Sequence, residues 1–173
     1  MKSIDYIYEC FDPKDLKVQS TFERRSGVTS KDKFKRANYF HLAHFTSSIL
    51  LKSILEKGLL PNSISGRKIE DNLSTDPNSV YLSAIYDSSY LKRTIKEFGG
   101  EGIIIMVEVE KHLLEADENL ISFNSNSNSP LKDEELLYNS MSFMGACKYK
   151  GIIDPNKILG VYSREGKQLN VNK

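Results

Sequence analysis

The chain has 173 residues, of which 39% are hydrophobic and 27% charged, and its formal net charge is +1 at pH 7. This composition is typical of one soluble globular domain; it excludes a disordered chain and a protein that binds nucleic acid through its overall charge. No apolar run approaches the ~20 residues of a membrane span. The N-terminus lacks the apolar core of a secretory signal, so we expect a cytoplasmic protein without membrane contact.

The cysteine and histidine content argues against a structural metal. Cys10 and Cys147 are far apart in the sequence and match no metal-ligand spacing. Together with three histidines they cannot build a convincing zinc site. We therefore expect reduced thiols and no bound metal.

Residues 1–38 form a basic lead-in that we expect to belong to the same domain as the rest. Between Lys14 and Arg36 there are eight lysines and arginines against three acidic residues. The simpler interpretation is a solvated surface, and the alternative is a patch that faces phosphates.

Residues 39–61 are the best-defined unit of the sequence. The run Tyr39–Phe45 is aromatic-rich with alternating character, which predicts a half-buried strand. The hydroxyls of residues 46–48 can cap a helix, and the apolar residues between 49 and 55 follow the spacing of one helical face. Gly58 can end that helix in a left-handed conformation, and Pro61 cannot continue it.

The remaining elements alternate between short strands and short helices. We predict strands at 79–84, 103–110, within 144–153 and at 158–162, and helices at 90–98 and 133–138. The polar stretches 62–78 and 122–129 are predicted to be loops, residues 112–118 a helical turn, and Glu108 and Glu110 an exposed strand end. With no βαβ repeat, this pattern predicts a single α+β domain with its core in residues 39–173.

Several short motifs, spread over residues 39–162, resemble the ADP-ribosyltransferase family. The closest pattern is the His–Tyr–Glu branch, which includes diphtheria-toxin-like and poly(ADP-ribose) polymerase-like enzymes. The motifs are HFT at 44–46, GLLP at 58–61, VYLS at 80–83, SSY at 88–90 and YKGIIDPNKI at 149–158. The resemblance implies split antiparallel β-sheets flanked by short helices, with NAD as the substrate and no metal.

The resemblance also implies roles for individual residues in NAD binding. His44 would bind the ribose hydroxyls of NAD, with Thr46 in support. Tyr81 and Tyr90 would enclose the nicotinamide ring, and offset stacking adds about 0.5–1.5 kcal/mol beyond burial. Ser89 would bind the carboxamide, while Arg67 would hold a phosphate.

The third member of the catalytic triad departs from the family pattern. The family glutamate should open the strand before Tyr149, but Gly145, Ala146 and Cys147 stand there. Glu134 or Glu135 could supply the carboxylate, and Glu135 is the nearest upstream acid. We therefore name His44, Tyr81 and Glu135 as the expected catalytic residues. A carboxylate would act by stabilising the oxocarbenium-like species formed when the nicotinamide bond breaks.

Three functions remain open at this point. The first is an NAD-dependent mono-ADP-ribosyltransferase, a toxin or effector included, that modifies a protein or nucleic acid. The second is an enzyme resembling the NAD-dependent RNA 2′-phosphotransferases, which rely on basic residues. The third is a degenerate domain that binds NAD, ADP-ribose or a protein partner.

Overall fold

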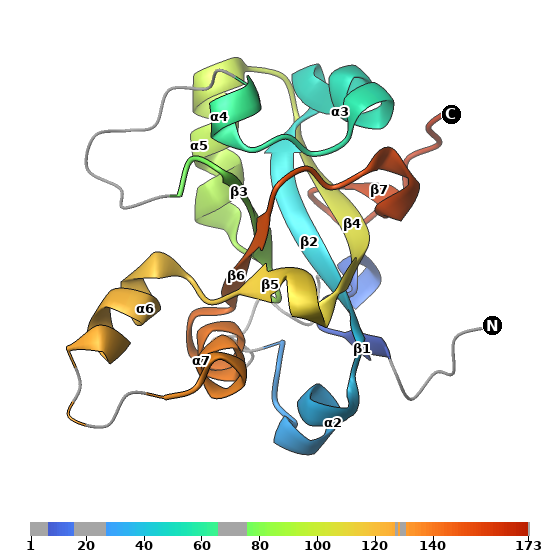
Figure 1. The fold of residues 1–173 in the computed structure, drawn as a ribbon. Helices are drawn as coiled ribbons and strands as arrows, with labels where there is room; N and C mark the ends of the chain where they lie inside the picture. Colours follow the sequence, from blue (N-terminus) through green and yellow to red (C-terminus); the bar gives the residue numbers. More distant parts are fainter. Residues whose placement is uncertain (1–6, 16–26, 66–75, 127, 129–130, 173) are drawn as a thin grey trace.

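The protein is an α+β domain, as the sequence predicts, and it is built on one seven-stranded sheet (Figure 1). The computed structural model describes residues 7–15, 27–65, 76–126, 128 and 131–172. The strands are β1 (Ile7–Glu9), β2 (Tyr39–Ser47), β3 (Ser79–Ser83), β4 (Gly102–Glu110), β5 (Leu114–Glu115), β6 (Ala146–Lys150) and β7 (Ile158–Ser163). The helices are α2 (Lys31–Arg36), α3 (Leu51–Lys57), α4 (Asn62–Ser65), α5 (Ser88–Phe98), α6 (Glu118–Ser125) and α7 (Asp133–Asn139).

The sheet is antiparallel except for one pair, and its order is β5-β6-β3-β2-β4-β7. The exception is β1, which runs parallel to β2 and pairs with residues 39–41. On its other side β2 pairs with β4 along its full length. β4 lies between β2 and β7, and its β-branched run is buried on both faces, as expected for an inner strand.

A narrow seam between β2 and β3 nearly divides this sheet. The two strands share a single register pair, Ala43 with Ser83, because β1 occupies the edge of β2 that precedes it. The expected split into two antiparallel sheets is therefore incomplete: the structure has one continuous sheet joined at this seam.

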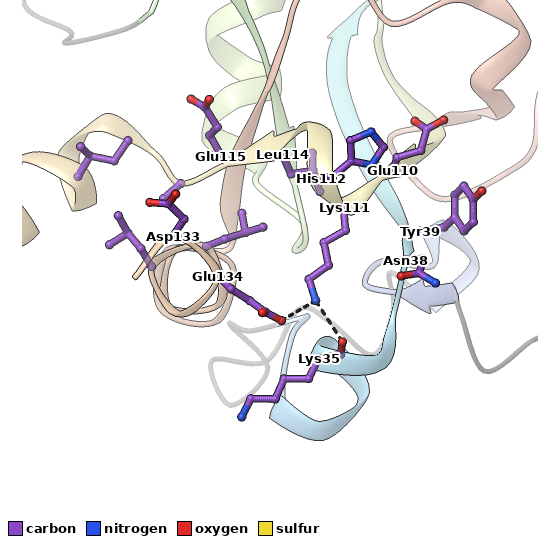
Figure 2. A pocket seen from close by; sticks show the side chains of 14 residues that line it. Lys35, Asn38, Tyr39, Glu110, Lys111, His112, Leu114, Glu115, Asp133 and Glu134 are labelled. Atoms are coloured by element: carbon purple, nitrogen blue, oxygen red, sulfur yellow. Dashed lines mark hydrogen bonds and ion pairs between the residues drawn. The ribbon is translucent and has the colours of Figure 1, made fainter. Parts of the chain in front are cut away.

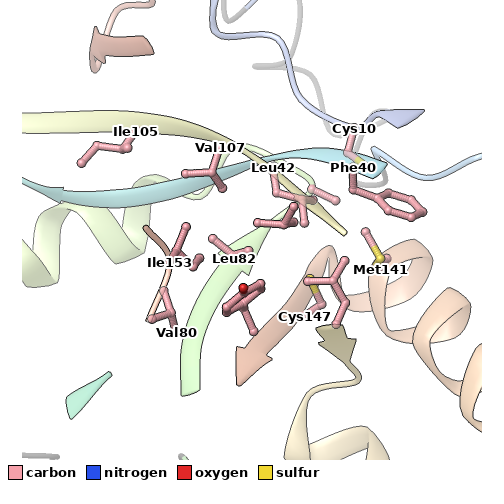
Figure 3. Close-up of a cluster of buried hydrophobic side chains, with 14 of the residues drawn as sticks. Cys10, Phe40, Leu42, Val80, Leu82, Ile105, Val107, Met141, Cys147 and Ile153 are labelled. Atoms are coloured by element: carbon pink, nitrogen blue, oxygen red, sulfur yellow. The ribbon is translucent and has the colours of Figure 1, made fainter. Parts of the chain in front are cut away.

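Two hydrophobic clusters lie on the two faces of the sheet. The larger cluster includes Phe40 and Leu42 of β2 (Figure 3). It also takes in Phe34 of α2, Ile54 of α3 and Leu137 of α7. The smaller cluster contains Ala43 and Phe45, which alternate with those residues along β2, and it is covered by α5. Since both faces of β2 are buried, the strand is fixed in register and orientation.

The turn after β2 and the end of α3 follow the predicted chemistry. Ser47 is the cap: its Oγ accepts a hydrogen bond from the Ile49 amide and donates one to the carbonyl of Gly99 at 2.5 Å. Gly58 ends α3 with φ of +85°. A Cβ at Gly58 would stand 2.1 Å from the carbonyl oxygen of Ile153, so glycine is required there for conformation and for space.

Three local predictions are wrong. The first part of the polar stretch 122–129 belongs to α6, which begins at the cap Asp117 and holds Ile121 half-buried. The expected helical turn at 112–118 is a 3-10 turn at Lys111–Leu113, followed by β5. The predicted loop 62–78 opens with the short helix α4.

The lead-in contributes directly to the core in the part that is described. Tyr8 stacks on Phe40 with ring centroids 5.7 Å apart, and its hydroxyl accepts hydrogen bonds from the amides of Thr29 and Ser30. Phe34 of α2 is 1% exposed. The amphipathic α2 thus turns its basic residues to solvent while its one aromatic side chain anchors it to the sheet.

Candidate functional site

His44 lies beside the seam and lines a cavity of about 290 Å³. Its Nδ1 lies 3.0 Å from the backbone carbonyl oxygen of Tyr81, across the seam. A carbonyl only accepts, so Nδ1 carries the proton, and in the neutral ring Nε2 is the acceptor nitrogen. The imidazole therefore supplies a hydrogen bond to the backbone of β3 at the place where β2 and β3 separate and no longer pair through their backbones.

The wall of the His44 cavity mixes hydroxyls and an amide with apolar groups. Thr46, buried on the same face of β2, lies next to His44 along the wall. The other polar side chains are those of Ser53, Asn62 and Ser65. The apolar part of the lining comes from Leu50, Ile54, Leu59, Leu60 and Phe98. The cavity can thus hold an uncharged ring together with hydroxyl or amide groups.

His41 does not belong to this cavity. Its Nε2 lies 3.0 Å from Glu108 and its Nδ1 lies 3.8 Å from Glu9, so the side chain links β1, β2 and β4. His41 and His44 are three residues apart on β2, so their side chains point to opposite faces of the strand, and of the two only His44 lines the cavity. Glu108 and Glu110 are not an exposed strand end, because Glu110 pairs with Lys157 at 2.5 Å.

The backbone carbonyl of Tyr81 contacts His44, but the side chain of Tyr81 contacts Glu118 and the amide of Asp76 instead. Its hydroxyl donates to Glu118 Oε2 at 2.6 Å and accepts from the Asp76 amide at 2.7 Å. Burial, followed by the hydrogen bond to Glu118, raises the pKa of Tyr81. Tyr81 does not line the His44 cavity. The structure therefore brings the strands of His44 and Tyr81 together, but not their side chains.

Lys148 completes the polar group around Tyr81. It stands opposite Tyr81 on β6, is 6% exposed, and donates to Glu118 Oε1 at 2.7 Å. Asp76 and Glu115 each lie 3.6 Å from the same ammonium. Burial alone would lower the pKa of Lys148, but the hydrogen bond and charge of Glu118 raise it.

The sequence offered a signal for this polar group that the motif comparison missed. Lys148 lies between Cys147 and Tyr149 on β6, and all three side chains are buried. A lysine is therefore buried within a strand. A buried lysine requires a carboxylate partner. Glu118 supplies it from α6, a helix that the sequence did not predict.

Ser89 and Tyr90 lie on the other side of the sheet from His44. Ser89 is exposed at the start of α5 and donates its hydroxyl to Asp87 at 2.5 Å. Tyr90 packs on the smaller hydrophobic cluster, against the face of β2 that carries Ala43 and Phe45. The expected enclosure of a ring by Tyr81 and Tyr90 is therefore not formed.

The acid expected to complete the triad is also elsewhere. Glu135 of α7 is exposed, pairs with Lys31 at 3.6 Å and lines a separate small cavity with Phe34 and Tyr138. Leu136 and Leu137 take the inward face of α7, as apolar side chains of an amphipathic helix do. Arg67, the expected phosphate ligand, lies outside the described residues.

Comparisons with known proteins give no assignment: no protein-family model matches the sequence, and no curated protein sequence matches it. Within the described ranges, no three histidine, cysteine, aspartate or glutamate side chains are grouped so that they could hold a metal ion. No helix in that part of the chain is long and apolar enough to cross a membrane.

Proposed function

We propose that this protein is an NAD-dependent mono-ADP-ribosyltransferase that modifies a macromolecular acceptor. The observation that carries the proposal is the order of three neighbouring strands. β2 with His44, β3 with Tyr81 and β6, where the resemblance expects the acid, are consecutive in the sheet. The seam between the first two opens beside His44, which lines a cavity.

His44 has the hydrogen-bonding state that recognition of a ribose requires. Because Nδ1 donates to the Tyr81 carbonyl, Nε2 is the acceptor nitrogen of the neutral ring, and in a complex it would take the hydrogen bond of a sugar hydroxyl. At about 290 Å³ the cavity is at the small end of ligand pockets, near 300 Å³. It suits the nicotinamide–ribose end of NAD, and the rest of the dinucleotide would lie outside.

In this proposal Phe98 and Asn62 take the roles that the resemblance implies for Tyr90 and Ser89. Phe98 is the aromatic side chain among the described residues of the cavity wall, so a nicotinamide ring would stack on it. Asn62 carries both a donor and an acceptor, which match the two ends of a carboxamide.

A binding domain without transfer activity is the second candidate, and a specific observation favours it. None of the described residues that line the His44 cavity is acidic. A site without a carboxylate would bind NAD but would give the transition state less stabilisation. The described lining includes neither lysine nor arginine, so nothing favours the RNA 2′-phosphotransferase alternative.

The proposal is tested by measuring NAD binding and nicotinamide release on the same preparations. NAD is expected to raise the melting temperature of the wild-type protein and to release nicotinamide over time. His44→Ala is expected to weaken NAD affinity by about tenfold, the upper range for one hydrogen bond. His41→Ala is the matched control, because His41 is on the same strand but outside the cavity.

The outcomes separate the candidates. Binding with release supports the transferase, and binding without release supports the domain that only binds. Equal losses in the two histidine variants, or no response to NAD, would remove the His44 cavity as the NAD site.

A further inference from the structure

A cavity larger than that of His44 lies elsewhere in the described part of the chain and has no assigned role. Its volume is about 930 Å³, and it lies where the start of β2, residues 110–116 and the first turn of α7 meet (Figure 2). Tyr39 at the first position of β2 lines it, and His44 is five residues further on, ~16 Å along the strand. The two cavities are therefore separate sites.

The inner wall of this cavity is apolar. Leu114 of β5, Ala116, and Leu136 and Leu137 of α7 all line it. These four side chains are 4–8% exposed, so they are packed into the core and present only one side to the cavity. An occupant would bury apolar groups against them, the main favourable contribution to binding.

Two of the charged pairs at this cavity are internally neutralised. Lys111 Nζ donates to Glu134 Oε1 at 2.7 Å and to the carbonyls of Phe34 and Lys35 at 2.9 and 3.3 Å. Glu110 is paired with Lys157. These paired groups present little net charge to an occupant.

The part of the cavity near Glu115 carries an excess of negative charge. Three carboxylates, those of Glu115, Glu118 and Asp76, share the single ammonium of Lys148. Glu118 lies 2.7 Å from this ammonium, whereas Glu115 lies 3.6 Å from it. The Glu115 side chain is 48% exposed. Asp133, the exposed first residue of α7, lines the same part, and Figure 2 shows Lys35 at the far side.

We propose that this cavity, called here the β5–α7 groove, binds a segment of a partner polypeptide in which a lysine or arginine is flanked by apolar residues. The cationic head would lie near Glu115 and Asp133, and its aliphatic stem would lie along the apolar wall. Lysine and arginine side chains commonly divide in this way between apolar surface and a charged group. The cavity is much larger than one side chain, so the apolar neighbours of the basic residue fill the remainder. This proposal does not depend on NAD chemistry.

The test is a titration of the ¹⁵N-labelled protein with two blocked peptides, Leu-Lys-Leu-Leu and Leu-Glu-Leu-Leu, followed by amide chemical shifts. The lysine peptide is expected to shift the amides of Leu114, Ala116 and Leu137, and added salt is expected to weaken it. The double variant Glu115→Gln, Asp133→Asn is expected to lose about fivefold in affinity, as for a surface ion pair. Glu165→Gln is the matched control, because Glu165 is exposed and pairs with Arg164 outside the groove.

The spectrum of each free variant shows whether it is folded, and the salt titration of the wild-type protein tests the charge contribution without any substitution. The proposal would be overturned if the glutamate peptide bound with the same affinity as the lysine peptide, or if the shifted amides lay outside the groove. It would also be overturned if spermine displaced the peptide with an affinity at least equal to that of the peptide. Because no step requires NAD, failure here leaves the His44 experiment unaffected.

Discussion

At the scale of single residues, the structure separates side chains that the motifs group together. His44 faces a cavity, whereas the hydroxyl of Tyr81 is engaged on both sides, by Glu118 and by the Asp76 amide. A tyrosine with two such partners anchors structure, since it joins β3 to α6 and to the segment that precedes β3. Its position beside His44 fixes the carbonyl that orients the imidazole.

Replacing Tyr81 with phenylalanine should therefore cost stability. Tyr81→Phe leaves the Asp76 amide and one Glu118 oxygen without their partner, and we expect a loss of about 1–3 kcal/mol in the free energy of unfolding. Urea unfolding measures it. Tyr162→Phe, at a half-buried tyrosine of β7, is the control and should stay within about 0.5 kcal/mol. A loss equal to that of the control would show that the hydroxyl network contributes nothing.

The Glu110–Lys157 pair predicts a dependence of stability on pH. Burial alone would raise the pKa of Glu110, but the hydrogen bond from Lys157 outweighs it and lowers the pKa. A lowered carboxyl pKa stabilises the fold above the unfolded value of about 4.3 and loses that contribution as the pH falls through the folded pKa. The stability difference between wild type and Glu110→Gln should thus be about 1 kcal/mol at pH 7 and should shrink below pH 4.

Urea unfolding of both proteins across this pH range measures the effect. Glu165→Gln serves as the control, because its partner Arg164 is exposed and such pairs contribute little. A difference that is constant with pH would assign the effect to packing rather than to charge.

At the scale of elements, the connection after α3 depends on one close approach of two backbone segments. Gly58 adopts φ of +85° directly under the Ile153 carbonyl, and Leu59 then pairs with Ile153. Gly99 ends α5 with a similar φ of +74°, but a Cβ there would meet nothing within 4 Å. The two glycines share a backbone conformation and differ in the space around them.

This pair allows conformation and packing to be measured separately. Gly99→Ala should cost about 1–2 kcal/mol for the left-handed conformation alone. Gly58→Ala should cost about 2 kcal/mol more, because the two segments must move apart. Chemical denaturation of the two variants gives the comparison, and equal costs would mean that the segments adjust freely.

The elements that the sequence predicted well are those with a strong local signal. Tyr39–Phe45 and the β-branched run from 103 to 110 are strands, and α5 begins at the cap Asp87, whose carboxylate accepts from the amides of Ser89 and Tyr90. The serine-rich and asparagine-rich segment of α6 has weak helix propensity, and only its cap and half-buried side chains make it helical. Propensity predicted a loop where packing produced a helix.

The site was predicted less completely because it depends on non-local pairing. His41 and His44 are separated by a local rule, the alternation of side chains along β2. The seam results from β1 pairing beside β3, and nothing in either strand alone indicates this. For the same reason Glu118, which is 30 residues before Lys148 in the sequence, could not be named as its partner.

At the scale of the whole molecule, the described lead-in and the rest of the chain form one core. Phe34 packs on Phe40 of β2 and on Tyr138 of α7, with ring centroids 5.4 and 5.2 Å apart. A segment that fills the space between two distant elements belongs to the same cooperative unit. We therefore expect a single unfolding transition for the protein.

The single cooperative unit is tested by comparing Phe34→Ala with the same substitution at an exposed phenylalanine, Phe143. Phe34 is 1% exposed and Phe143 is 79% exposed. Phe34→Ala should cost about 3–5 kcal/mol and should lower the midpoint of the single transition measured by fluorescence and circular dichroism. Phe143→Ala should change stability by less than about 0.5 kcal/mol. A separate early transition in Phe34→Ala would contradict the single unit.

The seam also has a consequence for synthesis on the ribosome. β1, β2, β4 and β7 lie on one side of it, and β3, β5 and β6 lie on the other, so the chain crosses it on the way from β2 to β3, β3 to β4, β4 to β5 and β6 to β7. Neither side is a continuous stretch of sequence. A nascent chain released from the exit tunnel as far as β5 lacks β6, which is the neighbour of both β3 and β5. Closure of the sheet must therefore await β6, which begins at residue 146 of 173, and segments made before it, such as the apolar β4, need protection from aggregation until then.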